Sequence, residues 1–103
     1  MANPNLDRSK RHEREVVHAA EDHDVQAERA WASNGESLGE HEECDVRLTA
    51  PDGTKVTVQA KRRKSIAQYL TCENASIVVV REDHGQNLAV VPLDDYLELL
   101  REG

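Results

Sequence analysis

Three polar residues at the ends of two adjacent predicted strands are the strongest candidates for a chemical site in this sequence. Asp45 begins the first of these strands, and Gln59 and Lys61 end the second. A carboxylate and an amide oxygen are hard ligands that suit a divalent cation such as Mg²⁺ or Mn²⁺. A lysine beside such a cation can hold developing negative charge while the metal activates water. These residue types together predict metal-assisted hydrolysis of a phosphodiester.

The alternation of polar and apolar residues predicts the β-hairpin that would bring these three residues together. Residues 45–50 and 54–61 alternate with a period of two, and the Pro-Asp-Gly sequence at 51–53 is typical of a turn. The apolar residues of each strand face one way, so the three candidates share the opposite face. Antiparallel pairing sets the beginning of the first strand beside the end of the second, and the hairpin therefore predicts a site at one end of the sheet.

Basic charge is concentrated in two runs, although the chain as a whole is acidic. The net charge is -7 at pH 7, yet residues 8–14 carry +3 and residues 61–64 carry +4, which leaves -14 for the rest of the chain. A single basic run is usually a solvated surface. Two runs on either side of one candidate site favour phosphate binding instead, and the charge pattern predicts a polyanionic partner.

The rest of the pattern predicts one small α/β domain over residues 8–103, preceded by a disordered tail at 1–7. The elements expected outside the hairpin are helices at 8–22, 65–70 and 93–101 and strands at 25–31, 76–81 and 88–91. Leu97 and Leu100 are expected to face inward from the last helix. The apolar run at 77–80 is typical of a strand covered on both faces. In the first helix, Glu13 lies one turn before Val17, at the edge of the buried face and not opposite it.

No segment of this sequence resembles a membrane anchor or a secretion signal. The longest apolar run has four residues, far fewer than a membrane span needs, and the N-terminus has no basic and then apolar layout. We therefore expect a protein of the cytoplasm. Cys44 and Cys72 are too few for a disulfide framework, so free thiols are expected. His41 and Cys44 have a spacing that could begin a zinc site, but no second pair of ligands is obvious.

The order and spacing of these residues resemble the PD-(D/E)XK nuclease superfamily, and within it the archaeal and viral Holliday-junction resolvases. The likeness extends over roughly residues 8 to 92. Its motifs are Glu13-Arg14-Glu15, Arg29, Ser33 in Ser33-Asn34-Gly35, Asp45 and Gln59-Ala60-Lys61. The resemblance implies a restriction-endonuclease-like core, in which a mixed central β-sheet is flanked by helices in the order α-β-β-β-α-β-β-α.

The resemblance also implies a role for each matching residue. Asp45, Gln59 and Glu13 would hold Mg²⁺ or Mn²⁺, and Lys61 would position or activate the attacking water. The residues expected to contact DNA are Arg14, Arg29, Ser33, Arg62, Arg63 and Lys64. A symmetric homodimer would cut two strands of branched DNA such as a four-way junction, in a host cell or as a virus-encoded enzyme.

Gln59 departs from the superfamily pattern, in which this position carries a glutamate. The amide oxygen can still bind a hard cation, but it brings no charge, so the affinity for metal should fall unless Glu42 or Glu43 compensates. The alternatives are therefore a degenerate DNA-binding or dimerisation module that does not cut, and a nicking or mismatch-type nuclease with the same site and a different substrate.

Overall fold

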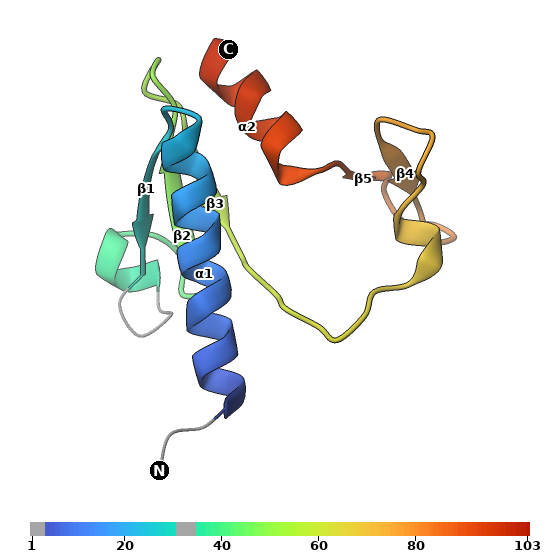
Figure 1. Ribbon diagram of the computed structural model, residues 1–103, viewed down its shortest axis with the longest axis horizontal. Coiled ribbons are helices and arrows are strands. Elements are labelled where there is room, and N and C mark those ends of the chain that lie inside the picture. Colours follow the sequence, from blue (N-terminus) through green and yellow to red (C-terminus); the bar gives the residue numbers. More distant parts are fainter. Residues whose placement is uncertain (1–3, 31–34) are drawn as a thin grey trace.

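The computed structural model describes residues 4–30 and 35–103, and its first half is a helix packed on a three-stranded sheet (Figure 1). Helix α1 spans Pro4–Asp22. Strands β1 (Gln26–Arg29), β2 (Val46–Thr49) and β3 (Lys55–Val58) pair antiparallel in the order β1-β2-β3. A short 3₁₀ helix, η1 (Gly35–Leu38), lies between β1 and β2. The predicted order of one helix and three strands is confirmed for this half.

Helix α1 begins earlier than predicted and ends where predicted. Residues 4–7, which the sequence analysis assigned to the tail, form its first turn in this structure. Proline is well suited to this position because the first turn has no use for its missing N–H. At the other end Asp24 adopts φ 60°. Its N–H donates to Glu21 O at 3.0 Å and the Val25 N–H donates to Ala20 O at 2.9 Å, which is a Schellman ending that turns the chain into β1.

The predicted hairpin of β2 and β3 is confirmed, with Leu48 opposite Val56 and Val46 opposite Val58. Gly53 takes φ 92° in the turn, a conformation that glycine adopts without strain. The Asp52 carboxylate accepts the Thr54 N–H at 2.8 Å. This backbone hydrogen bond, followed by one from the Thr54 side chain, lowers the pKa of Asp52.

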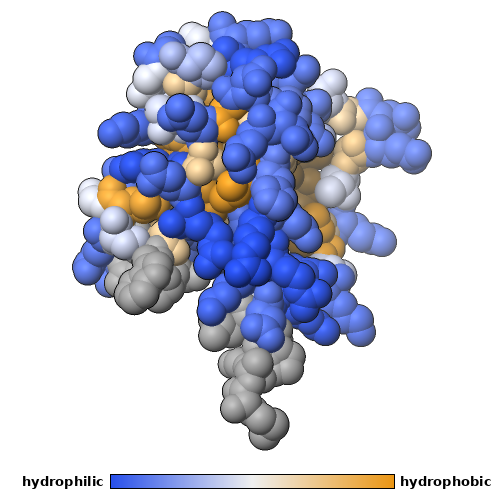
Figure 2. All heavy atoms as spheres, turned by 60° about the vertical axis from the view of Figure 1, so that its left-hand side comes forward, coloured by the Kyte–Doolittle hydropathy of each residue, from blue (hydrophilic) through white to orange (hydrophobic). Residues whose placement is uncertain are grey.

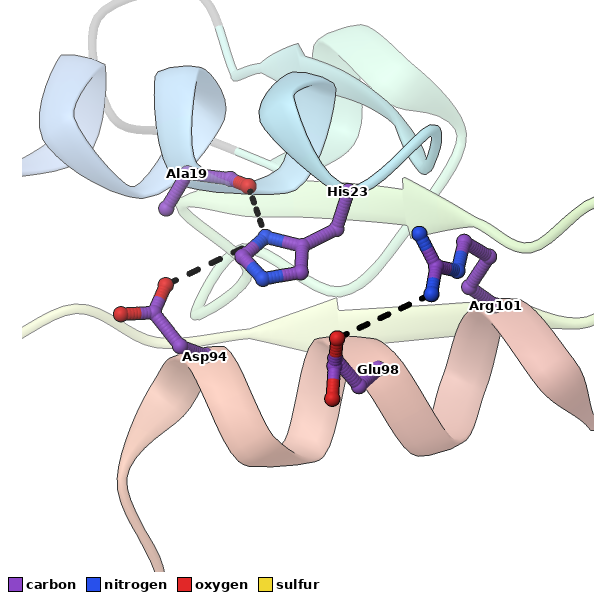
Figure 3. A network of polar contacts seen from close by, with 5 residues as sticks. All are labelled: Ala19, His23, Asp94, Glu98 and Arg101. Atoms are coloured by element: carbon purple, nitrogen blue, oxygen red, sulfur yellow. Dashed lines mark hydrogen bonds and ion pairs between the residues drawn. The ribbon is translucent and has the colours of Figure 1, made fainter.

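The core lies between α1, the inner face of the sheet and the C-terminal helix α2 (Leu93–Glu102). Leu97 is fully buried, as the sequence predicted, and the core cluster consists of Val16, Ala20, Val25, Val46, Leu48 and Leu97. His23, which follows α1, and polar residues of α2 also form a network of polar contacts (Figure 3). The His23 ring Nδ1 lies 2.8 Å from Ala19 O and 3.9 Å from the Asp94 carboxylate of α2. The C-terminal helix thus packs onto the N-terminal half.

The second sheet is a separate hairpin of β4 (Val78–Val80) and β5 (Leu88–Val90). The described residues form a mixed α/β fold with two antiparallel sheets, so the predicted α/β class is confirmed, whereas the single mixed central sheet is not. The chain after β3 runs extended and carries the hairpin away from β3 (Figure 1), because residues 61–64 are charged and offer no apolar side chain to the core. The helix predicted at 65–70 is reduced to one 3₁₀ turn, η2 (Gln68–Leu70).

The apolar strand β4 is not covered on both faces, contrary to the sequence prediction. Val79 is 60% exposed and Ile77 49%, and Val78 and Val80 are only half-buried.

In the described part of the chain, neither helix combines the length and the apolar character that crossing a membrane requires.

Candidate nucleic-acid and metal site

Glu13 and Arg29 form an ion pair between α1 and β1. Glu13 lies on the helix stripe that continues through Val16 and Ala20, and its side chain is 3% exposed. Arg29 lies on the inner face of the sheet, where its register partner is the buried Val46. The distance from Arg29 Nε to Glu13 Oε1 is 3.2 Å. A buried carboxylate needs such a partner, so the two residues predicted to contact metal and DNA contact each other here.

Asp45 is fixed by backbone and side-chain hydrogen bonds at the point where the three strands meet. Its carbonyl oxygen accepts the Ala30 N–H at 2.8 Å, and its own N–H donates to Val58 O at 2.8 Å. Val58 is also the register partner of Val46, so two residues of one strand face one residue of the next, as in a β-bulge. The Asp45 carboxylate accepts the Ala60 N–H at 2.9 Å, which holds it against the segment after β3.

Gln59 and Lys61 lie on either side of the amide that binds the Asp45 carboxylate. Both residues are exposed, and both follow the end of β3 directly. The hydrogen bond from Ala60 therefore holds the Asp45 carboxylate against the backbone between Gln59 and Lys61. Gln59 also lines an open pocket of about 390 Å³ together with Glu43 and Thr57, which places one of the two proposed compensating carboxylates beside the uncharged residue.

The possible zinc pair does not form a ligand set. The buried Cys44 Sγ donates to Val46 O at 3.3 Å, and His41 Nδ1 accepts the Glu43 N–H at 3.1 Å. A histidine that accepts at Nδ1 carries its proton at Nε2 and has no lone pair to offer a metal there. Across residues 4–30 and 35–103, no three His, Cys, Asp or Glu side chains are grouped as a metal site. Both cysteines are free thiols, as predicted.

The two basic runs meet in space. Arg8 and Ser9 of α1 line one open pocket of about 650 Å³ with Arg62, Arg63 and Lys64. No acidic residue is among these five, so every charged side chain in the lining is positive. The lower part of the described surface in Figure 2, where this part of α1 lies, is strongly hydrophilic, as is the top of that face. The pocket has the size and charge to hold phosphate groups of a nucleic acid backbone.

The other residues predicted to contact DNA lie in different surroundings. Arg14 is exposed on α1, one turn after the part that lines the basic pocket, whereas Arg29 is held in its pair with Glu13. Ser33 lies outside the described residues. Arg8 and Ser9 were not predicted as site residues, although Arg8 belongs to the basic run that was. Only the tertiary packing of α1 beside the segment after β3 identifies them.

A Mg²⁺ ion fits the donor set that remains. Magnesium is usually held by one or two carboxylates, with water and substrate phosphate oxygens completing its shell. The Asp45 carboxylate and the Gln59 amide oxygen supply hard donors at the end of the sheet. Glu13 pairs with Arg29 through Oε1 in this structure and its side chain is only 3% exposed, so it is not among the exposed donors. Residues 62–64, which line the basic pocket, follow Lys61 directly in the sequence. This pocket is suited to the phosphate that would complete the ligand shell of the metal.

Comparison with known proteins gives no family for this chain: no family model, no curated protein and no solved structure matches it. The assignment of a function therefore depends on the site itself.

Proposed function

We propose that this chain is a magnesium-dependent, structure-specific DNA endonuclease with the site of the PD-(D/E)XK superfamily, acting on branched DNA such as a four-way junction. The observation that carries the proposal is the hydrogen bond from Ala60 to the Asp45 carboxylate, which holds this carboxylate against the segment that contains Gln59 and Lys61 and continues into the basic pocket. The restriction-endonuclease-like core is part of the proposal, and α1 with β1 to β3 would be its first half.

The residues of the chain divide the work of hydrolysis between them. Asp45 and Gln59 would hold the metal, which supplies Lewis acidity and a nucleophilic water when bound. The exposed Lys61 ammonium would orient that water or stabilise charge on the scissile phosphate. Arg62, Arg63 and Lys64 would hold neighbouring phosphates. The Glu13 and Arg29 pair would keep the end of β1, and with it the carbonyl of Asp45, in position.

The experiment is incubation of the purified chain with a labelled four-way junction and Mg²⁺ or Mn²⁺. We expect cleavage that depends on the metal and that falls by at least about 100-fold in Asp45→Ala and Lys61→Ala. Matched controls are Asp83→Ala, in the turn between β4 and β5, and Lys55→Ala, at the far end of β3, which should keep full activity. Absence of metal-dependent cleavage, or cleavage that survives Asp45→Ala, would overturn the proposal.

A second candidate function is a module that binds DNA and does not cut it. Two observations favour it: Gln59 brings no charge to the site, and the Glu13 carboxylate is held by Arg29. This candidate predicts binding to a junction that weakens steeply with salt and with Arg62→Ala, without cleavage in any metal. Gain of cleavage in Gln59→Glu would identify a decayed nuclease. A nicking or mismatch-type enzyme would be distinguished by a panel of nicked, mismatched and branched substrates.

A further inference from the structure

An open pocket lies between the 3₁₀ turn η2 and the hairpin of β4 and β5 (Figure 1). Its volume is about 810 Å³, within the range of roughly 300 to 1,000 Å³ that is typical of ligand sites. The lining combines exposed apolar side chains with exposed polar ones, and includes Tyr69, Val79, Leu88, Arg81, Glu82 and Gln86. None of these residues belongs to the candidate site at Asp45, so the pocket has no part in the hydrolysis proposed above.

The apolar part of the lining offers surfaces for a planar ligand. Tyr69 is 72% exposed, and Val79 and Leu88 of the two strands are 60% and 54% exposed. Exposed aromatic rings are the surfaces on which proteins stack the bases of single-stranded nucleic acids. A base inside an intact duplex is already stacked on both faces and is not accessible to such a ring. The pocket is therefore suited to an unpaired base.

The polar part of the lining matches the other groups of a nucleotide. The Arg81 guanidinium only donates hydrogen bonds, and the Glu82 carboxylate only accepts them. In the described part of the chain, neither residue takes part in an ion pair. A nucleotide would supply a phosphate for Arg81 and an amino group for Glu82. An apolar peptide would cover both charged groups without giving either a partner, which is costly.

The position of the pocket relative to the basic pocket suits a single DNA strand. Lys64 lines the basic pocket, and Tyr69 follows it by five residues. Five residues span at most about 18 Å even when the chain is fully extended. Successive nucleotides of a stacked strand advance by about 3.4 Å each, so roughly five of them cover this distance. One strand can therefore occupy both pockets.

We propose that this pocket binds an unpaired nucleotide of a DNA strand whose neighbouring phosphates lie in the basic pocket. Its base stacks on Tyr69, its phosphate accepts from Arg81, and an amino group of its base donates to Glu82. This binding mode rests on the DNA substrate of the proposed function, and it narrows that substrate to branched DNA with a single-stranded segment beside the branch. Adenine, cytosine and guanine carry an exocyclic amino group and thymine does not, so we expect thymine to bind most weakly.

The first test is the affinity of the full chain for labelled DNA in EDTA, measured by fluorescence anisotropy so that cleavage is not involved. Tyr69→Ala should weaken binding to a single strand of about 12 cytosine nucleotides by at least about 5-fold, because stacking on the ring is lost. It should change binding to a blunt duplex by less than about 2-fold, because phosphate contacts dominate there. Tyr69→Phe keeps the ring and should bind as the unaltered chain does. Leu99→Ala, at a residue 66% exposed on α2, is the matched control and should change neither affinity.

The second test concerns the edge of the base. A cytosine strand should bind at least about 3-fold more tightly than a thymine strand of equal length, because only cytosine has an amino group for the Glu82 carboxylate. Both bases are pyrimidines, so the comparison keeps the ring size constant. Glu82→Ala should remove the difference between the two strands.

Two results would overturn the proposed nucleotide site: single-strand binding that Tyr69→Ala leaves intact, or equal weakening of single-strand and duplex binding by this variant. Equal affinity for the cytosine and thymine strands would overturn the role of Glu82 and, with it, the site as proposed. Arg62→Ala, in the basic pocket, should weaken binding to both kinds of DNA. If it does so while Tyr69→Ala changes neither, the nucleotide site fails and the proposed function stands. The proposed function is decided separately, by metal-dependent cleavage of the four-way junction.

Discussion

Two stretches of apolar residues in this chain meet opposite environments. In β2, Val46 and Leu48 are fully buried between α1 and the neighbouring strands. In β4, Val79 has a similar side chain and is 60% exposed. Both segments favour extended structure by composition, and both form strands. The difference comes from what packs on them: β2 has a strand on each side and helix α1 against it, whereas β4 pairs with one strand and shares an open pocket with Tyr69 of the 3₁₀ turn η2.

The contrast between β2 and β4 corresponds to a difference between the two halves of this small chain. The N-terminal unit of α1 and β1 to β3 is held by a buried core and places Asp45 beside Gln59 and Lys61. The hairpin of β4 and β5 contributes none of the predicted site residues. Rigid positioning of a site requires the first kind of packing, while an open sheet edge is suited to contact with another chain.

The largest expected effect is in the core strand. Leu48→Ala should lower the free energy of unfolding by about 3 kcal/mol, because it removes a fully buried side chain and leaves a cavity. Val79→Ala should change it by less than about 0.5 kcal/mol in a dilute, monomeric sample, since the side chain is mostly solvated there. Urea denaturation followed by circular dichroism measures both. Equal losses for the two variants would mean that β4 is buried in solution as β2 is.

The sequence predicted the parts of the fold that depend on local pattern. The turn at 51–53 and the period of two on both sides of it were sufficient to predict the hairpin of β2 and β3 and the apolar face of each strand, and the spacing of Leu97 and Leu100 predicted the inner face of α2. The place of β4 could not be predicted in this way. A continuous apolar run indicates a strand that is stabilised by burial of both faces, but which element buries them depends on tertiary structure.

The candidate site was predicted in the same partial manner. The alternating pattern predicted that Asp45 lies at the same end of the sheet as Gln59 and Lys61. In the structure, the Ala60 N–H donates to the Asp45 carboxylate, which holds this carboxylate against the segment that contains the other two residues. Strict alternation cannot reveal the irregular pairing at Asp45, because one extra residue in a strand changes which way the following side chains point. The pairing of Glu13 with Arg29 joins a helix to a strand, and no local pattern contains it.

The second prediction concerns this ion pair. Glu13→Gln should lower the free energy of unfolding by about 2 kcal/mol, since it leaves the Arg29 guanidinium, only 26% exposed, without its charged partner. Glu82→Gln, an exposed glutamate after β4, removes the same charge and should have little effect. Thermal unfolding of both variants at neutral pH provides the comparison. A Glu13→Gln protein as stable as the Glu82→Gln protein would remove the reason to regard the pair as a positioning device for Asp45.

The smallest expected effect is in the turn between β2 and β3. The Thr54 N–H, by bonding to the Asp52 carboxylate, lowers the pKa of that group below its ordinary value of 3.8. A lowered pKa in the folded state means that the stabilisation is present at pH values above the unfolded-state value and is lost as the pH falls through the folded-state value. Asp52→Ala should therefore be slightly less stable than the unaltered chain at pH 6, and the difference should disappear well below pH 3.8.

The control is Asp83→Ala, in the turn of the other hairpin, which changes the net charge equally and corrects for general charge effects. Thermal melts of the three proteins across this pH range make the comparison, and a difference that persists in strong acid would assign the effect to the backbone of the turn and not to the charge on Asp52.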